Sequence, residues 1–249
     1  MTLSIIGTGN MAKALALGLK ENYDLEIVGR TLDKAEAFIK EHDLKATSFA
    51  MQDFDISDKN LLFCVKPYAL SPVGEMLKGK ANTIYSILAG SSVNALKDAL
   101  QAKAYVRAMP NVAAEVNYSM TTLTGDASLE KESIEIFSSI GPTLWLNSEK
   151  ELDIATGLAG SGPAYLALIA EALADGAVKQ GLKRTDAQKL TNGLFLGFSK
   201  LLQTTHPALL KDSVMSPGGT TAAGYSALEK NGVRAGCIDA IEAAYQKTL

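Results

Sequence analysis

The sequence has little cysteine, histidine or tryptophan. Its 249 residues contain two cysteines, two histidines and one tryptophan. Cys64 and Cys237 are too few to build a disulfide framework, and Cys64 stands in an apolar run typical of a buried strand. This cysteine usage favours the reducing cytoplasm. No metal site is expected, and neither histidine is a candidate base, because His42 falls at a polar helix end and His206 in a turn.

The sequence also lacks an excess of charge of either sign and a long apolar run. It has 24 Lys and Arg residues against 27 Asp and Glu residues, and a net charge of −3 offers no basic surface for nucleic acid. No uninterrupted apolar stretch reaches the roughly 18 residues of a membrane span, and the first residues lack the basic segment of a secretory signal. We therefore expect a small-molecule substrate and neither a nucleic-acid nor a membrane partner.

A glycine-rich segment directly follows the first apolar run. Residues 3–6 are typical of a short strand, and a helical pattern runs from the glycines through Leu19. Here Gly7 would allow a tight turn, Gly9 would let the backbone approach a pyrophosphate, and Ala12 would let the helix pack on the strand. The pattern predicts a dinucleotide site, with an ordinary structural turn as the alternative. The predicted cofactor residues here are Gly7, Thr8, Gly9, Asn10, Met11 and Ala12.

Arg30 closes the second apolar run, about 20 residues beyond the glycines, where the ribose of a dinucleotide is recognised. An acidic residue at this place suits the 2′-hydroxyl of NAD, whereas an arginine suits a 2′-phosphate. Arg30 and the adjacent Thr31 therefore predict NADP(H), with NADH as the second choice. The alternative is that Arg30 only ends a strand in solvent.

The chain divides into two halves of different pattern. Residues 1–148 alternate short apolar runs with helical segments, which predicts a Rossmann-type α/β domain with a parallel sheet. Residues 149–249 read as an all-α domain. Beyond the first two apolar runs, the predicted strands are 61–65, 83–88, 104–107, 121–124 and 143–146. The predicted helices of the second half are 163–180, 186–203, 217–230 and 232–247.

The helix predicted from Pro163 has almost no polar face before Asp175, and the next helix is nearly as apolar. A helix that is apolar all round must be buried on most sides. A helical region of about 100 residues cannot easily cover two such helices by itself. We therefore expect a homodimer through the C-terminal helices, with burial against the chain's own first domain as the alternative.

Three segments follow strands of the predicted sheet, where ligands of open parallel sheets bind. Lys66 would meet a phosphate or ribose of the cofactor, unless it is simply solvated. Gly90 would let the backbone come close to the nicotinamide, and Asn111 would orient an amide or a carboxylate. The predicted cofactor residues of these segments are Val65, Lys66, Pro67, Ala89, Gly90 and Asn111.

A second glycine-rich segment lies in the helical half. Ser216 and Pro217 read as the N-cap and first residue of a helix, which would be an ordinary start. Capping does not explain Gly218 and Gly219 in the first turn, because each glycine there costs roughly 1 kcal/mol of helix propensity. Bare N–H groups at a helix start suit a substrate carboxylate.

These segments together resemble pyrroline-5-carboxylate reductase, in order and spacing and over essentially the whole chain. The resemblance implies NAD(P)H-dependent reduction of L-1-pyrroline-5-carboxylate to L-proline, the last step of proline biosynthesis. It also implies an N-terminal Rossmann domain, a helical dimerisation domain and further assembly, commonly to a decamer. The motifs that carry it are Gly7 to Ala12, Val65-Lys66-Pro67, Met109-Pro110-Asn111, Gly160-Ser161-Gly162-Pro163-Ala164-Tyr165 and Ser216-Pro217-Gly218-Gly219-Thr220-Thr221.

The resemblance also assigns substrate residues. Thr221 matches the threonine whose hydroxyl contacts the substrate ring nitrogen, which makes it the candidate catalytic residue. Glu149 matches an acidic substrate-site position, although residues 149–151 read equally well as a solvated charge run. The implied substrate residues are Glu149, Ser216, Gly218, Gly219, Thr220 and Thr221.

The chain departs from the family pattern after Asn111. Val112-Ala113 replaces the usual Thr-Pro, and Asn117-Tyr118-Ser119 stands where a Gly-x-Gly is common. Rival interpretations are a β-hydroxyacid dehydrogenase, another imine reductase, or a non-catalytic NADP(H)-binding sensor. The hydroxyacid enzymes carry a lysine in the helix after the glycine motif, whereas here the first lysine after Pro163 is Lys179.

Overall fold

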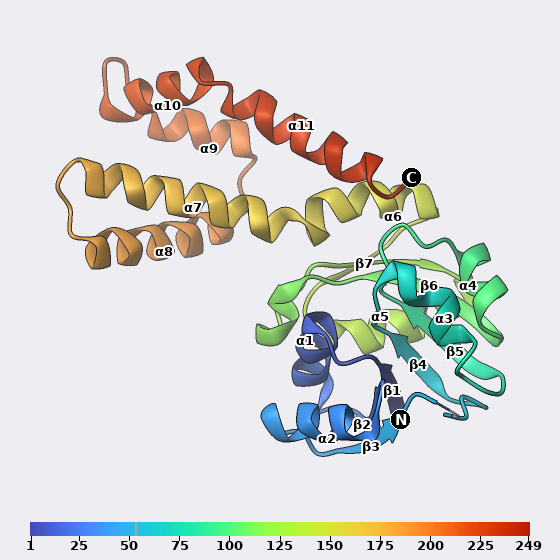
Figure 1. Cartoon of the computed structure of the whole chain (residues 1–249). Coiled ribbons are helices and arrows are strands. Elements are labelled where there is room, and N and C mark those ends of the chain that lie inside the picture. The colour runs from blue at the N-terminus through green and yellow to red at the C-terminus, as the bar shows by residue number, and fades with distance from the viewer. Residues whose placement is uncertain (53) are drawn as a thin grey trace. The chain divides into compact units, whose positions relative to one another are not determined.

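A computed structural model describes residues 1–52 and 54–249 (Figure 1). The chain forms two compact units. Unit 1 comprises Met1–Pro163 together with Ala243–Leu249, and unit 2 comprises Ala164–Glu242. The sheet predicted for residues 1–148 lies entirely in unit 1, and the last strand of this sheet ends at Trp145.

Unit 1 is built on one sheet, to which the described residues contribute eight strands in the order β3-β2-β1-β4-β5-β6-β7-β8. Strands β1 to β6 run parallel to one another, as predicted for a Rossmann-type domain. The strand order reverses between β1 and β4, which is where dinucleotides bind in such sheets. The strands are β1 (Thr2–Ile6), β2 (Asp24–Gly29), β3 (Ala46–Ala50), β4 (Asn60–Phe63), β5 (Ala81–Ser86), β6 (Ala102–Met109), β7 (Thr121–Gly125) and β8 (Thr143–Trp145).

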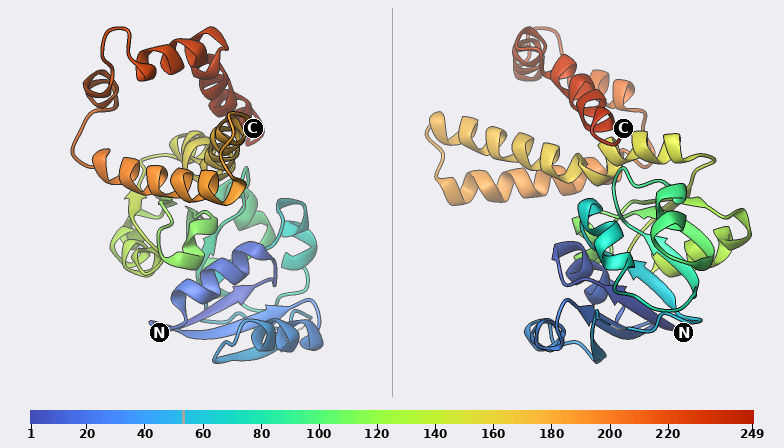
Figure 2. Two further views of the ribbon diagram at one scale, coloured as in Figure 1. Left: turned by 90° about the vertical axis from the view of Figure 1, so that its left-hand side faces the viewer. Right: turned by 45° about the vertical axis from the view of Figure 1, so that its right-hand side comes forward.

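Helices cover both faces of this sheet (Figure 2). Along β1, Leu3 and Ile5 belong to one apolar cluster and Ile6 to the other, because successive side chains of a strand point to opposite faces. The α-helices of unit 1 are α1 (Asn10–Leu19), α2 (Leu32–Glu41), α3 (Leu70–Gly74), α4 (Val93–Ala99), α5 (Glu130–Ser138) and α6 (Glu149–Ala155). Shorter turns are the 3₁₀-helices η1 (Pro67–Ala69), η2 (Val112–Val116) and η3 (Ala127–Leu129), and the π-helix η4 (Thr156–Gly160).

The sheet differs from the prediction at its two ends. Strand β3 was not predicted, because Phe49 is its one large apolar residue and none of its side chains is fully buried. Strand β7 runs antiparallel to β6, so the sheet is mixed rather than wholly parallel. The turn before β7 reverses the chain without a helical crossover long enough for a parallel connection.

Five helices make up unit 2, and the first and the last of them extend a few residues into unit 1. They are α7 (Gly162–Lys179), α8 (Arg184–Leu201), α9 (Pro207–Val214), α10 (Thr220–Lys230) and α11 (Val233–Gln246). Four of them match predicted helices, whereas α9 was missed because its eight residues are too few for a clear periodic pattern. The predicted start of α10 at Pro217 was wrong, since Gly218 has a φ of +71° and the helix begins at Thr220.

The apolar helices of unit 2 are not buried within the chain. Leu168 of α7 is 67% exposed and Leu196 of α8 is 66% exposed, while Ala174 is the one residue of α7 that is buried. By length and composition alone the continuous helical segment Glu149–Lys179 could cross a membrane, although it contains no uninterrupted apolar stretch of roughly 18 residues. The middle of this segment, residues 154–170, carries no charged residue and is rich in small ones. Helices buried between subunits have the same composition.

Gly18 gives a test of how α1 is held in unit 1. A Cβ built on Gly18 would lie 2.5 Å from Cγ2 of Ile140 and 2.9 Å from the carbonyl oxygen of Ala114. We expect Gly18→Ala to lower the free energy of unfolding by about 1–3 kcal/mol, since overpacking shifts neighbouring backbone. Urea unfolding followed by the fluorescence of Trp145, which packs on the same cluster as Ile140, measures this change.

The control for this variant is Gly236→Ala in α11. A Cβ on Gly236 meets no atom within 4 Å. The free energy of unfolding of Gly236→Ala should therefore equal that of the wild type or be slightly higher. Equal stability of the two variants would contradict the close packing of α1.

Candidate functional site

The first candidate element is the turn from β1 to α1. Gly7 has a φ of +115°, its N–H donates to the carbonyl oxygen of Val28 (2.9 Å), and a Cβ there would lie 3.1 Å from the carbonyl oxygen of Cys64. Helix α1 begins after Gly9 with no side-chain cap and no acidic residue in its first turn. The first N–H groups of such a helix are free to bind an anion, so this turn fits a pyrophosphate.

The remaining residues of this turn differ in exposure. Gly9 and Asn10 are exposed, Thr8 and Met11 are half-buried, and Ala12 is fully buried in the cluster that joins α1 to the sheet. The backbone of the turn therefore faces solvent while its small residue packs inward, as the sequence predicted.

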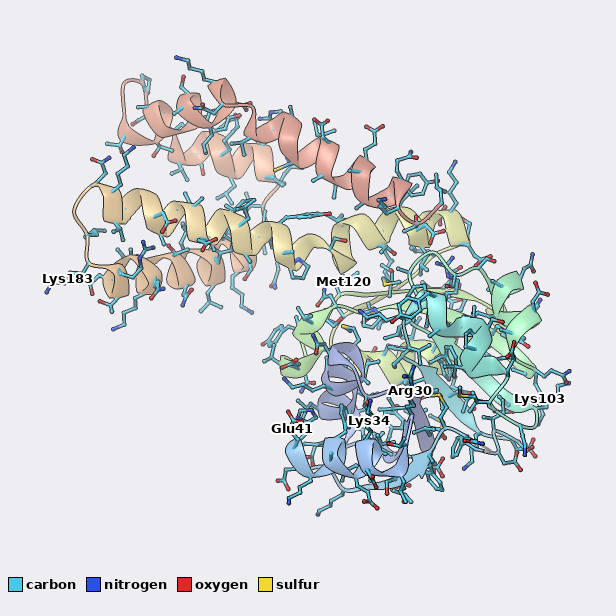
Figure 3. All side chains as sticks on the ribbon, in the orientation of Figure 1. Arg30, Lys34, Glu41, Lys103, Met120 and Lys183 are labelled. Carbon is cyan, nitrogen blue, oxygen red and sulfur yellow. The ribbon has the colours of Figure 1, made fainter. Side chains whose placement is uncertain are left out.

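The second element is the end of β2 and the start of α2. Arg30 and Thr31 are both exposed, and Thr31 is the N-cap of α2 without using its hydroxyl as a cap. Lys34, in the first turn of α2, is also exposed and was missed by the sequence interpretation, although its spacing of four from Arg30 was a usable signal (Figure 3). Asp33 is the acidic residue of the same turn. Two cations and a free hydroxyl here fit a phosphate monoester.

The third element comprises the loops after β4 and β5. Lys66 is exposed ahead of Pro67, the first residue of η1, and Val65 is half-buried. Ala89 and Gly90 are exposed after β5. Gly90 has a φ of +68°, and a Cβ there would lie 3.1 Å from the carbonyl oxygen of Thr248. The last residues of the chain therefore lie against the loop that was predicted to meet the nicotinamide.

Asn111 has a structural use for its side chain. Its Nδ2 donates to the carbonyl oxygen of Ala159 (2.9 Å), and its Oδ1 accepts from the N–H of Ala113 (2.9 Å). Its own N–H donates to Oγ of the buried Ser119. These contacts tie η2 to β6 and η4. All of these hydrogen bonds are to atoms of the protein. The role of the Asn111 side chain toward the cofactor therefore stays a prediction.

The unusual loop after Asn111 keeps a definite shape. Residues Val112–Val116 form η2, and Asn117 follows with a φ of 59° in the left-handed region. Asparagine tolerates this conformation better than most residues, so Asn117 replaces a glycine at low cost. Lys13 of α1 donates to Glu115 of η2 (3.1 Å), which links the loop to the cofactor-turn helix.

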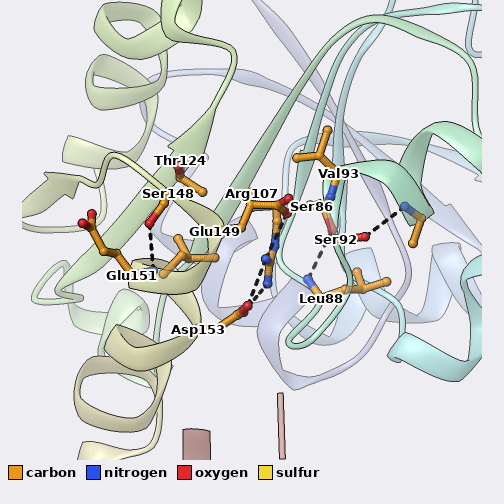
Figure 4. A network of polar contacts seen from close by, with 12 residues as sticks. Ser86, Leu88, Ser92, Val93, Arg107, Thr124, Ser148, Glu149, Glu151 and Asp153 are labelled. Carbon is orange, nitrogen blue, oxygen red and sulfur yellow. Dashed lines mark hydrogen bonds and ion pairs between the residues drawn. The ribbon is translucent and has the colours of Figure 1, made fainter. Parts of the chain in front are cut away.

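A buried ion cluster lies at the carboxyl end of β6 and was not predicted. Arg107 is 2% exposed, and its guanidinium donates to Asp153 (2.6 Å) and to Oε1 of Glu149 (3.1 Å), both on α6 (Figure 4). The same Oε1 accepts from the N–H of Val93 at the start of α4 (2.8 Å). In the structure the carboxylate of Glu149 is therefore bound to Arg107 and to the start of α4. A role of Glu149 in substrate binding stays a prediction.

The segment before α10 is the candidate substrate loop of unit 2. Gly218 is left-handed, and Gly219, rather than the predicted Ser216, is the N-cap of α10. Gly219 donates to the carbonyl oxygen of Ser216 (3.0 Å), and a Cβ on Gly219 would lie 2.4 Å from Oγ of Ser216. The two glycines therefore form a turn ahead of the helix instead of weakening its first turn. The helix start has no side-chain cap and no acidic residue.

The hydroxyls of Thr220 and Thr221 stand at this free helix start, and both residues are exposed. Further along α10, Glu229 accepts hydrogen bonds from Tyr225 of the same helix and from Arg234 of α11. The guanidinium of Arg234, with the Tyr225 hydroxyl, lowers the pKa of Glu229 to about 2. This group stays ionised at neutral pH and links α10 to α11.

Other reactive groups are less suited to catalysis. Burial raises the pKa of the Cys64 thiol, which keeps it protonated and unreactive. Burial and the hydrogen bond to Glu132 likewise raise the pKa of Tyr85. Within residues 1–52 and 54–249, no group of three His, Cys, Asp or Glu side chains is placed to hold a metal ion.

Two family models match the chain. The model for pyrroline-5-carboxylate reductase dimerisation matches residues 149–249, and the model described as NADP oxidoreductase coenzyme F420-dependent matches residues 2–90. The first match covers residues 149–249, and the second covers only part of residues 1–148.

Similar proteins cover the whole chain. A pyrroline-5-carboxylate reductase of Synechocystis is 39% identical over 259 residues, which span 99% of this chain and 96% of the relative. The solved 1-pyrroline-5-carboxylate reductase of Streptococcus pyogenes superposes with a TM-score of 0.89 at 32% identity, covering 100% of this chain and 98% of that one. A pyrroline carboxylate reductase of Plasmodium falciparum, solved with NADP bound, has a TM-score of 0.85 at 27% identity, with coverage of 100% and 98%.

The cations at the start of α2 give a test of cofactor choice. We expect Arg30→Ala and Lys34→Ala each to weaken NADPH binding about tenfold or more relative to NADH, because each removes a charge-assisted hydrogen bond to the 2′-phosphate. The dissociation constants of both cofactors, measured by fluorescence titration, give the ratio. Lys40→Ala, at the exposed far end of α2, is the control and should leave the ratio unchanged. Equal losses for NADPH and NADH would contradict this role.

Proposed function

The chain belongs to the pyrroline-5-carboxylate reductase family, and we infer that it reduces L-1-pyrroline-5-carboxylate to L-proline with NADPH. The observation that carries this function is a pair of glycine-led helix starts, at α1 and α10, that no side chain caps. The first suits the pyrophosphate of a dinucleotide and the second suits a carboxylate. The substrate of this family is a cyclic imine that carries a carboxylate. The start of α1 can therefore bind the cofactor, and the start of α10 can bind the substrate.

The cofactor residues that we propose lie in unit 1. NADPH supplies the hydride for the reduction when it is bound. The N–H groups at the start of α1 hold its pyrophosphate, and Arg30, Thr31 and Lys34 hold its 2′-phosphate, while NADH binds less tightly. Lining the nicotinamide side are Val65, Lys66, Pro67, Ala89 and Gly90, with Asn111 shaping the adjoining loop.

The substrate residues that we propose lie in unit 2. The N–H groups at the start of α10 bind the substrate carboxylate, and Gly218 and Gly219 keep that approach open. The hydroxyl of Thr221 donates to the ring nitrogen, and a water behind it supplies the proton that this nitrogen gains. Protonation of this nitrogen makes the neighbouring ring carbon an electrophilic iminium carbon, so these residues act chiefly by orienting the substrate.

Assembly and location form the remaining part of the proposal. Residues 149–249 act as the dimerisation and substrate-binding domain, and dimers assemble further to a decamer. The exposed leucines of α7 and α8 supply the apolar surface for the first of these steps. Both cysteines are free, Cys64 buried and Cys237 exposed, which supports a reducing cytoplasm.

The reaction is tested by following NADPH oxidation and proline formation with pyrroline-5-carboxylate as substrate. We expect Thr221→Ala to lower kcat/KM about tenfold or more without changing the NADPH dissociation constant, since a hydrogen bond to a developing charge is lost. Thr221→Ser keeps the hydroxyl and should retain most of the activity. An unchanged kcat/KM in Thr221→Ala would sink the catalytic role. NADPH binding without oxidation by the wild type would favour another imine or a sensor.

Light scattering after gel filtration tests the dimer. We expect the wild type to have at least twice the chain mass of 26.3 kDa, and Leu168→Glu or Leu196→Glu to shift it toward a single chain, because a buried charge opposes the interface. Leu144→Glu, on the exposed strand β8 of unit 1, is the matched control and should leave the mass unchanged. A wild type of 26.3 kDa would refute the assembly.

A further inference from the structure

The buried ion cluster of Arg107, Glu149 and Asp153 joins three elements of unit 1. Arg107 lies on β6, both carboxylates lie on α6, and Glu149 also accepts from the first N–H of α4. The side chain of Asp153 is 14% exposed and that of Glu149 is 37% exposed, so the Arg107–Asp153 pair is shielded from solvent and Glu149 is partly open to it. A shielded pair holds its geometry better than a surface ion pair, which water and salt weaken.

Glu149 acts on α4 as a cap supplied from a distant part of the chain. Ser92, the N-cap of α4, accepts from the N–H of Ala95 (3.1 Å), whereas the N–H of Val93 donates to Glu149 (2.8 Å). The start of α4 is thereby held by one local side chain and by one carboxylate 56 positions away in sequence. A carboxylate at this place also interacts favourably with the helix dipole.

The segment held by this cap continues directly from the proposed nicotinamide loop. Ala89 and Gly90 are exposed and lie between the buried end of β5 and the start of α4. Fixing Val93 therefore limits how far this loop can move. Arg107 in turn fixes Glu149, because its guanidinium donates to the same Oε1 that accepts from Val93 (Figure 4).

We propose that Arg107 and Glu149 are positioning residues, which set the place of the loop 89–92 against the nicotinamide through the N-terminus of α4. The proposal rests on the proposed function for the identity of the cofactor. It assigns Glu149 to the cofactor loop rather than to the substrate. Asp153 has a different part, since its carboxylate pairs with Arg107, whereas the acceptor of the Val93 N–H is Glu149.

The first experiment compares two variants of the cluster by amide hydrogen exchange without cofactor. Glu149→Ala removes the acceptor of Val93, whereas Asp153→Asn leaves that acceptor in place and weakens the same guanidinium pairing. We expect Glu149→Ala to speed exchange in residues 88–96 about tenfold, and Asp153→Asn to speed it less than about twofold, because the acceptor of Val93 stays in place. Equal exchange in both variants would overturn the proposal, and this readout does not depend on the reaction.

The second experiment measures steady-state kinetics with NADPH and with 4-deuterated NADPH. Glu149→Ala should lower kcat about 10- to 100-fold and enlarge the deuterium isotope effect, because a displaced loop slows the chemical step. The NADPH dissociation constant should change less than about twofold, since the phosphate contacts remain. Glu149→Gln keeps an oxygen that accepts from Val93 and should restore most of kcat. Arg107→Lys should fall between wild type and Glu149→Ala.

Two kinetic outcomes would overturn the proposal. A raised KM for pyrroline-5-carboxylate with unchanged kcat in Glu149→Ala would place Glu149 on the substrate. A lowered melting temperature with unchanged kcat would make the cluster a matter of stability alone. A wild-type protein that binds NADPH but does not oxidise it would refute the proposed function, while the exchange experiment would still test the cap.

Discussion

The placement of the cofactor turn depends on the hydrogen bonds that hold β1 between β2 and β4. Strand β1 pairs in parallel with both neighbours, and the connections from β1 and β4 leave toward opposite faces of the sheet. This divergence opens the crevice in which a dinucleotide lies. Gly7 stands at its mouth, bonded to Val28 and with a φ of +115° that residues with a side chain rarely adopt. A shift in this pairing would displace the turn and the start of α1 together.

Local sequence patterns predicted the parts of the fold that local chemistry decides. The apolar run before Gly7, the helical pattern after it and the second strand, which ends just before Arg30, all have the predicted structure. The start of α10 shows where such patterns stop being sufficient. By residue type, Ser216-Pro217 is a valid start for a helix. However, Gly218 has a left-handed backbone, so the helix cannot run through it and begins at Thr220. The φ of Gly218 is a property of the folded loop and cannot be read from the residue types.

The Arg107 cluster could not be predicted, because its contacts join residues 42 and 46 positions apart. In the sequence Arg107 is a single cation in a strand, and Glu149 belongs to a run of charges. Burial changes what these groups do, since a guanidinium shielded from water is stable only with carboxylates beside it. The resemblance to a family indicated that Glu149 matters, and the contacts show which neighbours it holds.

The exposed faces of α7 and α8 also bear on how the chain responds to dilution. Among the described residues of unit 2, Ala174, Ala187 and Thr191 are the buried ones, which is a very small core for about 80 residues. Unit 1 carries both large apolar clusters. The free energy that keeps unit 2 folded must then come largely from association, and it falls as subunits separate. At low concentration a protease would find the helical half first, while the nucleotide-binding half stayed intact.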